Sequence, residues 1–211
     1  YHHQIQEDVV QALIQLNKRP AIGFEVFSLE QTGFLMHHTL GGPSPFIKEP
    51  DLSEEGMLRR SLGWGRDRDE DWQFYFPLLR LAKEHRLPAF GVDLPRGIRL
   101  RLSRVGLGGL SSLERALLHP TGFDDPTYRQ FMYEELTRSH CGWASPELLR
   151  KLYETWLARN DAMARAIVDM VKDQRGEPVL VILGAGHVQH NLGVYERVAH
   201  MLPGVRQVNV G

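Results

Sequence analysis

Residues 178–191 read Pro-Val-Leu-Val-Ile-Leu and then Gly-Ala-Gly-His-Val-Gln-His-Asn, and this stretch decides the fold class. An unbroken run of β-branched residues and leucine is typical of a strand buried on both faces, as in parallel sheets. Gly184 and Gly186 permit a sharp exit from that strand. In open α/β sheets a ligand lies outside the carboxyl ends of the strands, so His187 and His190 stand where a site is expected.

Two further apolar runs predict strands, and each delivers chargeable side chains. Residues 21–27 carry Glu25 inside the run, and residues 88–92 lead directly into Asp93 and, three positions later, Arg96. Each has a plain alternative. Glu25 can point to solvent or cap the next helix, and Asp93 can belong to a turn in which the Arg is solvated.

The rest of the pattern is mainly helical, with a helical subregion at about 97–172, a helix at 194–202 and a last short strand at 205–210. This order predicts an α/β fold: a central, mostly parallel sheet flanked by helices, with a helical insertion before the last βαβ portion. A length of 211 residues fits one domain.

Several positions in the predicted helices carry specific expectations. Asn160 falls inside the apolar stripe of a long helix at about 146–171, so it is either a satisfied core amide or a group that faces a polar pocket. The tryptophan and methionines of that stripe are expected in the core. His37 and His38 are expected to be exposed, because adjacent helical residues do not share a face. Pro77 is expected to begin a fresh helix.

Composition excludes several classes of protein. The net charge is −1 and no Lys/Arg run is interleaved with aromatic residues, so nucleic acid is not expected as a partner. Cys141 is the only cysteine, which excludes an internal disulfide. No apolar segment reaches the roughly 20 residues that span a bilayer. The chain starts at Tyr1 instead of Met, so we expect an upstream segment to be missing.

The glycines after the strand do not form a dinucleotide-binding loop. That fingerprint needs a small residue at position 189, which is Gln189, and an acidic residue about 20 positions later, where the chain ends. A nucleophile elbow and a Walker lysine are also missing from the sequence.

The chargeable residues at the strand ends are expected to converge on one crevice, because the carboxyl ends of parallel strands lie at the same edge of a sheet. They are Glu25, Asp93, Arg96, His187 and His190. His3, at the head of the first helix, could join them if a further strand precedes that helix.

Taken together, the sequence resembles the ChaN-like haem-binding uptake proteins of the wider Tiki/TraB/erythromycin-esterase-like superfamily. The resemblance covers nearly the whole chain and rests on a set of motifs in the family's order and spacing. They are Tyr1-His2-His3-Gln4-Ile5-Gln6, Ile22-Gly23-Phe24-Glu25-Val26-Phe27, Trp64, Tyr75-Phe76-Pro77, Asp93-Leu94-Pro95-Arg96, Asn160-Asp161-Ala162-Met163-Ala164 and Gly184-Ala185-Gly186-His187-Val188.

The resemblance implies a single ChaN-like α/β domain over 1–211 that lacks an upstream first strand with a Gly-Glu-x-His motif. It implies haem binding in bacterial iron acquisition or haem handling, and an exported, periplasmic or outer-membrane-anchored lipoprotein. Haem, haem-uptake machinery and a second copy in a homodimer are the implied partners. One departure is Asp93, where the family usually has Asn, and this could change the charge of the crevice.

Haem requires an axial ligand, a wide apolar face and groups that hold its propionates. Arg96 could meet a carboxylate, and the sequence leaves the axial ligand open among four residues. The axial candidates are His187, His190, Tyr75 and Tyr195. With His3, Glu25 and Asp93, these residues form the predicted cofactor-binding set.

A metal-assisted hydrolase is the alternative, because superfamily hydrolases use a Glu like Glu25 and a His like His187. Zn²⁺ or Mn²⁺ would then be held by these residues with His3 in support, and the metal-bound water would be the nucleophile. A binding protein remains the favoured interpretation.

Overall fold

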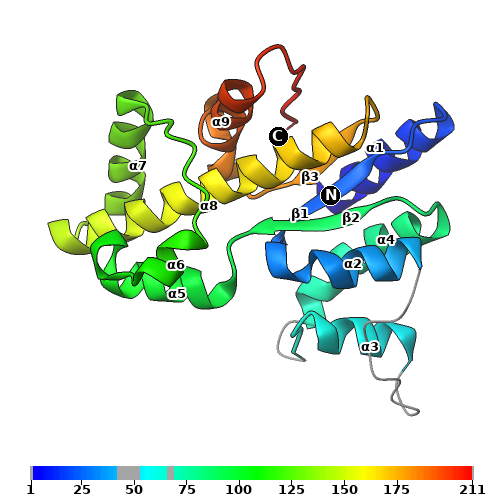
Figure 1. Cartoon of the computed structure of the whole chain (residues 1–211), viewed down its shortest axis with the longest axis horizontal. Helices are drawn as coiled ribbons and strands as arrows, with labels where there is room; N and C mark the ends of the chain where they lie inside the picture. Colours follow the sequence, from blue (N-terminus) through cyan, green and yellow to red (C-terminus); the bar gives the residue numbers. More distant parts are fainter. Residues whose placement is uncertain (1, 42–52, 66–68, 211) are drawn as a thin grey trace. The chain divides into compact units, whose positions relative to one another are not determined.

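The computed structural model describes residues 2–41, 53–65 and 69–210, and its parallel strands lie in the order β2-β1-β3 (Figure 1). The strands are β1 (Ala21–Ser28), β2 (Ala89–Asp93) and β3 (Val179–Ile182). In the β1/β3 pair, Ala21 lies opposite Val179 and Phe24 opposite Ile182. The predicted α/β fold with a parallel sheet flanked by helices is confirmed.

The chain forms two compact units. Unit 1 comprises Tyr1–Val92 and Asp169–Ile182, and unit 2 comprises Asp93–Val168 and Leu183–Gly211. Unit 1 therefore holds nearly all of the sheet, and unit 2 holds most of the helical insertion. That 1–211 is a single domain stays a prediction.

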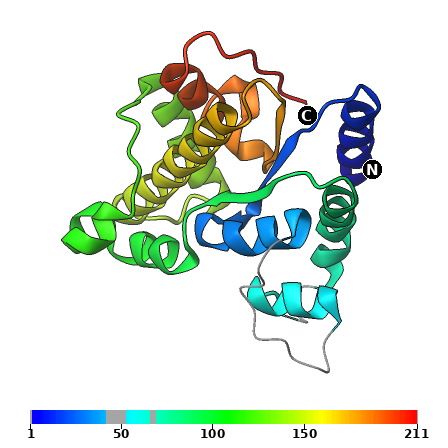
Figure 2. The same ribbon diagram turned by 45° about the vertical axis from the view of Figure 1, so that its right-hand side comes forward.

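The helices of unit 1 pack on one another beside the sheet. They are α1 (His2–Gln15), α2 (Thr32–Leu40), α3 (Glu54–Ser61) and α4 (Asp69–Glu84), with a 3-10 turn η1 (Leu29–Gln31) after β1. Helix α4 contacts α1 and α2, and α3 lies against α2, as both views of the chain show (Figures 1 and 2). The hydroxyl of Ser53 accepts a hydrogen bond from the Gly56 N–H at 3.1 Å and so caps α3.

Helix α4 runs through Pro77 without a break, so the prediction of a fresh helix there is wrong. A proline inside a helix costs about 3 kcal/mol because it removes a backbone hydrogen bond. The residues that follow it offset this cost, since Leu78, Leu79 and Ala82 are fully buried in the core of unit 1.

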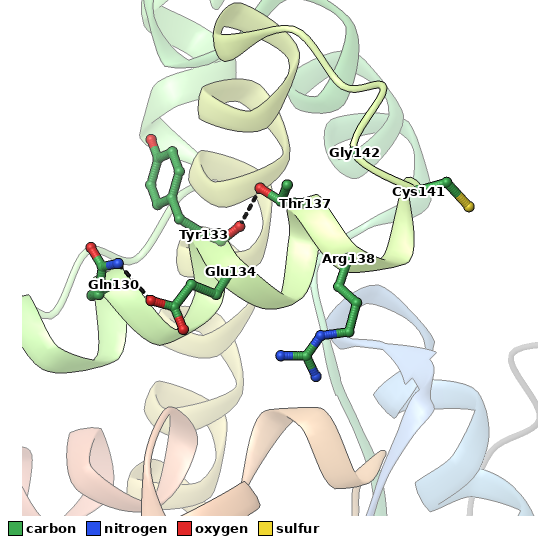
Figure 3. Close-up of a pocket in the computed structure, with 7 residues that line it drawn as sticks. All are labelled: Gln130, Tyr133, Glu134, Thr137, Arg138, Cys141 and Gly142. Carbon is green, nitrogen blue, oxygen red and sulfur yellow. Dashed lines mark hydrogen bonds between the residues drawn. The ribbon is translucent and has the colours of Figure 1, made fainter.

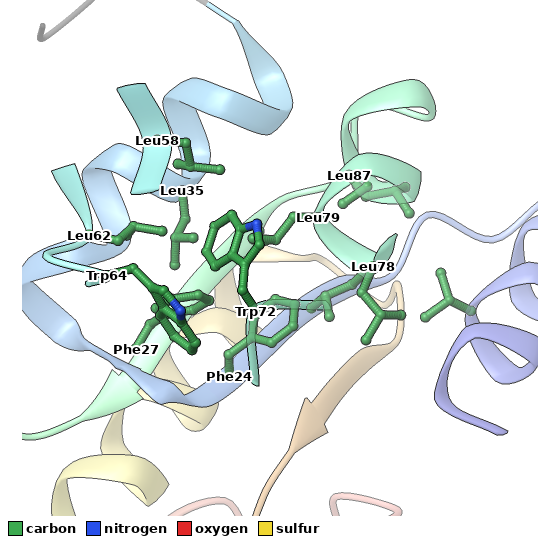
Figure 4. Close-up of a cluster of buried hydrophobic side chains, with 14 residues drawn as sticks. Phe24, Phe27, Leu35, Leu58, Leu62, Trp64, Trp72, Leu78, Leu79 and Leu87 are labelled. Carbon is green, nitrogen blue, oxygen red and sulfur yellow. The ribbon is translucent and has the colours of Figure 1, made fainter. Parts of the chain in front are cut away.

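That core combines leucines with a cluster of buried aromatic side chains (Figure 4). The Trp64 and Trp72 rings lie 5.2 Å apart between centroids, and Phe24 meets Phe27 edge-on at 5.7 Å. Tyr75 packs against three of these rings, at 6.1 to 6.5 Å. These contacts, with the leucines of α2, α3 and α4, hold the helices on β1.

Two strand predictions fail in part. Val179–Ile182 are only half-buried, against the expectation of burial on both faces. The segment 205–210 forms no strand. Its Val208 and Val210 side chains are exposed, and Asn209 donates a side-chain hydrogen bond to the Val188 carbonyl at 2.8 Å.

Unit 2 consists mainly of helices, in agreement with the helical subregion predicted at about 97–172. They are α5 (Arg96–Val105), α6 (Ser112–Ala116), α7 (Pro126–Ser139), α8 (Pro146–Asp173), which continues into unit 1, and α9 (Val194–Met201), with 3-10 turns η3 (Leu107–Gly109), η4 (Ala185–His187) and η5 (Gln189–Asn191). The helices predicted at about 146–171 and 194–202 are confirmed. Across the described residues, none of the helices has the length and apolar character needed to cross a membrane.

His38 is 8% exposed, so the expectation of exposure is wrong for this residue. Its Nδ1 lies 3.4 Å from Glu54 Oε1, while its buried Nε2 has no hydrogen-bond partner among the described residues. Burial lowers the pKa of the His38 imidazole below its usual 6.5, although Glu54 acts in the opposite direction. The folded state therefore favours the neutral ring.

Acidification is expected to destabilise the protein through His38. Because the unfolded chain binds this proton more readily, the stability that His38 contributes is complete above pH 6.5 and falls as the pH drops below it. Urea unfolding between about pH 7 and pH 5 should show a smaller loss for His38→Gln than for the unsubstituted protein. The exposed His85 of the same unit supplies the control, His85→Gln, and equal pH slopes in all three proteins would contradict the assignment.

Candidate functional site

Four side chains of unit 2 form one hydrogen-bonded group around His187. The imidazole, 2% exposed at the end of η4, places Nδ1 2.6 Å from Asn160 Oδ1. Asn160 Nδ2 donates to the Tyr128 hydroxyl at 2.7 Å, and Trp156 Nε1 donates to the same oxygen at 2.6 Å. Tyr128 comes from α7, whereas Asn160 and Trp156 come from successive turns of α8. Both side chains of α8 therefore donate to the same Tyr128 oxygen.

The His187 ring is also held by stacking. It lies parallel to the Trp156 indole, with 3.9 Å between centroids and 6° between the planes. The Arg159 guanidinium lies 5.8 Å from the centre of the same indole. Gly186 runs close to the indole, since a Cβ there would come within 3.1 Å of it. The loop before His187 therefore follows the Trp156 ring closely.

Asp93 is a buried carboxylate between two arginines. It is 1% exposed, accepts hydrogen bonds from Arg159 Nε at 2.9 Å and Nη2 at 3.0 Å, and also binds Arg99. The Leu94 N–H donates to it at 2.8 Å. Asp93 is the last residue of β2, and Arg96 is exposed, as the alternative of a turn with a solvated Arg predicts. Two guanidinium groups against the Asp93 carboxylate leave an excess of positive charge.

Arg197 is a second buried charge, on α9. Its Nε donates to Asp161 Oδ1 at 2.6 Å and its Nη1 to the Gly193 carbonyl at 2.9 Å. The guanidinium also lies 5.6 Å from the centre of the Tyr128 ring. Burial raises the pKa of the Tyr128 phenol, with the hydrogen bonds from Trp156 and Asn160 acting in the opposite direction. Tyr128 therefore stays a neutral phenol.

The predicted site residues fall into both units. Glu25 lies in β1 and Tyr75 in the aromatic core of unit 1, whereas the others with described side chains lie in unit 2. Those in unit 2 are Asp93, Arg96, His187, His190 and Tyr195. His3 belongs to α1, but its side chain lies outside the described part of the chain. That Glu25 and His187 share one crevice stays a prediction.

The three remaining residues of unit 2 differ in exposure. Arg96 is exposed in the first turn of α5. His190 is exposed as well, in a left-handed conformation with φ 58°, and its ring meets Phe131 edge-on at 5.7 Å. Tyr195 is half-buried and its hydroxyl donates to the Gln207 carbonyl at 3.4 Å. Of the two imidazoles proposed as axial ligands, His187 is buried and His190 is exposed.

Most of the residues around His187 are not marked as its partners by any pattern in the sequence. Trp156 was assigned to the core as part of an apolar stripe, and nothing in the local pattern marked Tyr128, Arg159 or Arg197. The one signal was Asn160, whose place inside that stripe demands a hydrogen-bond partner. The first alternative for Asn160 is confirmed, since it is a buried amide with hydrogen bonds to Tyr128 and His187. That it faces a polar pocket stays a prediction.

A groove of about 680 Å³ runs along one face of α7 (Figure 3). Its lining comes from α7 between Gln130 and Arg138 and from the turn with Cys141 and Gly142. Within this lining, Gln130 Nε2 donates a hydrogen bond to Glu134 Oε1, one turn further along α7, at 2.6 Å. No predicted haem-site residue lines this groove.

Within the described residues, no group of three or more His, Cys, Asp or Glu side chains could hold a metal ion. The Zn²⁺ or Mn²⁺ site of the hydrolase alternative has no support from such a cluster.

The chain is similar to one known protein family and to two solved structures. A family model described as "Haem-binding uptake, Tiki superfamily, ChaN" matches residues 1–198. A solved structure described as cofacial haem binding to ChaN of Campylobacter jejuni has a TM-score of 0.65 at 16% identity, over 95% of this chain and 71% of that chain. A mutant erythromycin esterase in its open conformation gives a TM-score of 0.45 at 12% identity, over 93% and 63%. No curated protein matches the chain.

Proposed function

Since the chain belongs to the ChaN family of haem-binding uptake proteins in the Tiki superfamily, we propose that its function is to bind haem. The observation that carries this proposal is the family match over residues 1–198, which includes every strand of the sheet and both units. The structural likeness to the Campylobacter protein supports the fold at this low identity.

Unit 2 contains the types of side chain that bind haem. A neutral imidazole can ligate the iron, an aromatic ring can cover the porphyrin face, and a guanidinium can hold a propionate. His190 and Phe131 supply the first two side by side, and exposed Arg96 supplies the third. Haem, when bound, contributes the iron and its redox and ligand chemistry.

His190 is the axial-ligand candidate that exposure favours. His187 is buried between Asn160 and Trp156, Tyr75 packs among core rings, and the Tyr195 hydroxyl binds a carbonyl. A non-glycine residue at φ 58° is uncommon, and such conformations concentrate at functional sites. We therefore assign His190 the role of iron ligand within this proposal.

Hemin titration of the purified protein is expected to give a shifted Soret band and a saturable stoichiometry. His190→Ala should weaken hemin binding by about tenfold or more, because loss of an iron ligand worth about 1.4 kcal/mol already gives that factor. The absence of both a Soret shift and saturation in the unsubstituted protein would refute haem binding.

His200→Ala is the matched control. His200 is another exposed imidazole of unit 2 and lies beside a phenyl ring, Phe123, at 5.3 Å. It should bind hemin like the unsubstituted protein. If His190→Ala and His200→Ala both keep full affinity and the same Soret band, haem binding stands and the ligand is another residue.

The same proposal extends to a place in bacterial iron acquisition or haem handling, as an exported, periplasmic or outer-membrane-anchored lipoprotein. The proposal also includes a homodimer and contact between this protein and haem-uptake machinery. The family's description as uptake proteins supports this extension. Light scattering during hemin titration tests the dimer: a constant monomer mass at saturation would contradict it.

A further inference from the structure

We propose that helices α5 and α6 form a surface that binds an anionic lipid bilayer, with arginines on the lipid phosphates and leucines in the outer acyl region. This α5–α6 surface consists of exposed side chains of unit 2, namely Leu100, Arg104, Leu113, Arg115 and Leu117. The inference concerns a contact of the protein surface and does not depend on haem binding.

Positive charge is concentrated in this part of the chain. Residues 96–118 contain five arginines and one acidic residue, Glu114, whereas the net charge of the whole chain is −1. Arg101 Nε donates to Glu114 Oε1 at 3.2 Å, so these two charges compensate each other. The same ion pair joins α5 to α6, and the two helices lie side by side at the lower left of Figure 1.

Two arginines of the α5–α6 surface carry a charge that no carboxylate balances. Arg104 is exposed and has no ion-pair partner within the described part of the chain. Arg115 is exposed too, and its guanidinium donates to the carbonyls of Leu110 and Gly108 at 3.1 and 3.2 Å, which leaves its charge intact. A guanidinium offers several N–H donors in a planar fork that matches a phosphate group. Anionic headgroups therefore supply the counter-charge that both side chains lack.

Helix α5 is amphipathic, and its exposed side combines a leucine with an arginine. Leu100 is 39% exposed and lies four residues before Arg104, so the two side chains share one side of the helix. The opposite side carries the buried Ile98 and Leu102. Basic residues beside apolar ones on an amphipathic helix are typical of helices that lie in a membrane interface.

Helix α6 extends the apolar part of the surface. Leu113 is 83% exposed and Leu117, four positions later, is 50% exposed, so both stand on one face. A leucine gains free energy when it leaves water, and a bilayer offers hydrocarbon just below its phosphates. Nucleic acid carries phosphates as well, but its bases stack on aromatic side chains, and residues 96–118 contain none. A bilayer is therefore the partner that fits both the leucines and the arginines.

Co-sedimentation of the purified protein with lipid vesicles tests the proposal. We expect saturable binding to phosphatidylcholine vesicles with about one third phosphatidylglycerol, and about tenfold weaker binding to phosphatidylcholine alone, because each basic residue near an anionic surface strengthens binding. No binding to the anionic vesicles, or equal binding to both kinds, would refute the proposal.

Two double variants test the two kinds of side chain separately. Arg104→Gln with Arg115→Gln should weaken binding to the anionic vesicles by about 30-fold. Leu113→Ser with Leu117→Ser should weaken it by about tenfold or more, because serine gains nothing on leaving water. All four positions are exposed, so both variants should fold, and circular dichroism checks this.

Matched controls remove the same groups elsewhere on the protein. Arg80→Gln with Arg138→Gln takes away two exposed arginine charges, and Leu16→Ser removes a leucine that is 69% exposed. These variants should bind the anionic vesicles like the unsubstituted protein. If the α5–α6 variants bind as tightly as these controls, the surface is not the binding site and the proposal fails.

Hemin titration of the variant with Leu113→Ser and Leu117→Ser keeps this proposal separate from haem binding. The variant should keep the hemin affinity of the unsubstituted protein while its vesicle binding is weakened. Loss of both would assign the α5–α6 surface to haem and overturn the bilayer proposal. Absence of hemin binding in every variant and in the unsubstituted protein would refute haem binding and leave the vesicle results to decide this proposal.

Discussion

Replacement of Arg197 by methionine is expected to lower the free energy of unfolding by about 3–5 kcal/mol, since it breaks a buried ion pair and leaves the other charge behind. Arg197 is fully buried and binds both Asp161 and the Gly193 carbonyl. Without Arg197, the Asp161 carboxylate still accepts a hydrogen bond from the Thr121 hydroxyl at 2.8 Å, but the cation that balances its charge is lost. Urea unfolding followed by circular dichroism gives the measurement.

A double variant shows whether the uncompensated charge is the cause. Arg197→Met with Asp161→Leu removes both charges, and this pair should lose less stability than Arg197→Met alone. Arg138→Met is the control, because Arg138 pairs with Glu135 while 72% exposed, and such surface pairs contribute about 0–1 kcal/mol. If the double variant is the less stable, packing and not charge explains the loss.

The substitution Asp93→Asn is expected to cost about 3 kcal/mol, because it leaves two guanidinium groups facing each other without the carboxylate between them. Asp93 receives three kinds of donor: Arg159, Arg99 and the Leu94 N–H. An asparagine keeps one acceptor oxygen but turns an amide NH₂ toward a cation. Chemical denaturation should show a lower midpoint with an unchanged slope.

Asp124→Asn provides a matched comparison in the same unit. Asp124 also pairs with an arginine, Arg129, but both side chains are nearly half exposed. Solvent screens that pair, so its loss should cost less than about 1 kcal/mol. If Asp93→Asn and Asp124→Asn lower the free energy of unfolding equally, burial does not strengthen the ion pairs of Asp93.

The sequence was sufficient for the three strands of the described sheet and for most helices because their signals are local, whereas the strand predicted at 205–210 does not form. Apolar runs at 21–27, 88–92 and 178–183 each gave a strand within a residue or two of the structure. The family resemblance stated from motifs is confirmed by the match over 1–198. The failures occur where long-range packing decides, as at Pro77, where burial of the next turn outweighs the cost of the proline.

The site was harder to predict because its key contacts join residues distant along the chain. His187 was identified from its place after a strand, but its partners lie 27 or more positions away on α7 and α8. Trp156 looks like an ordinary core residue until its N–H is traced to Tyr128. The burial of Asp93 depends on Arg159, which is 66 positions distant and carries no sequence signal of pairing.

The position of β3 has a consequence for how the protein behaves in concentrated solution. In the described sheet its outer edge carries peptide groups that no strand satisfies, and residues 179–182 hold neither a charge nor a proline. Natural edge strands usually carry such residues to discourage intermolecular pairing. β3 lacks such residues, so its length of only four residues is the feature that limits pairing with a second molecule at this edge.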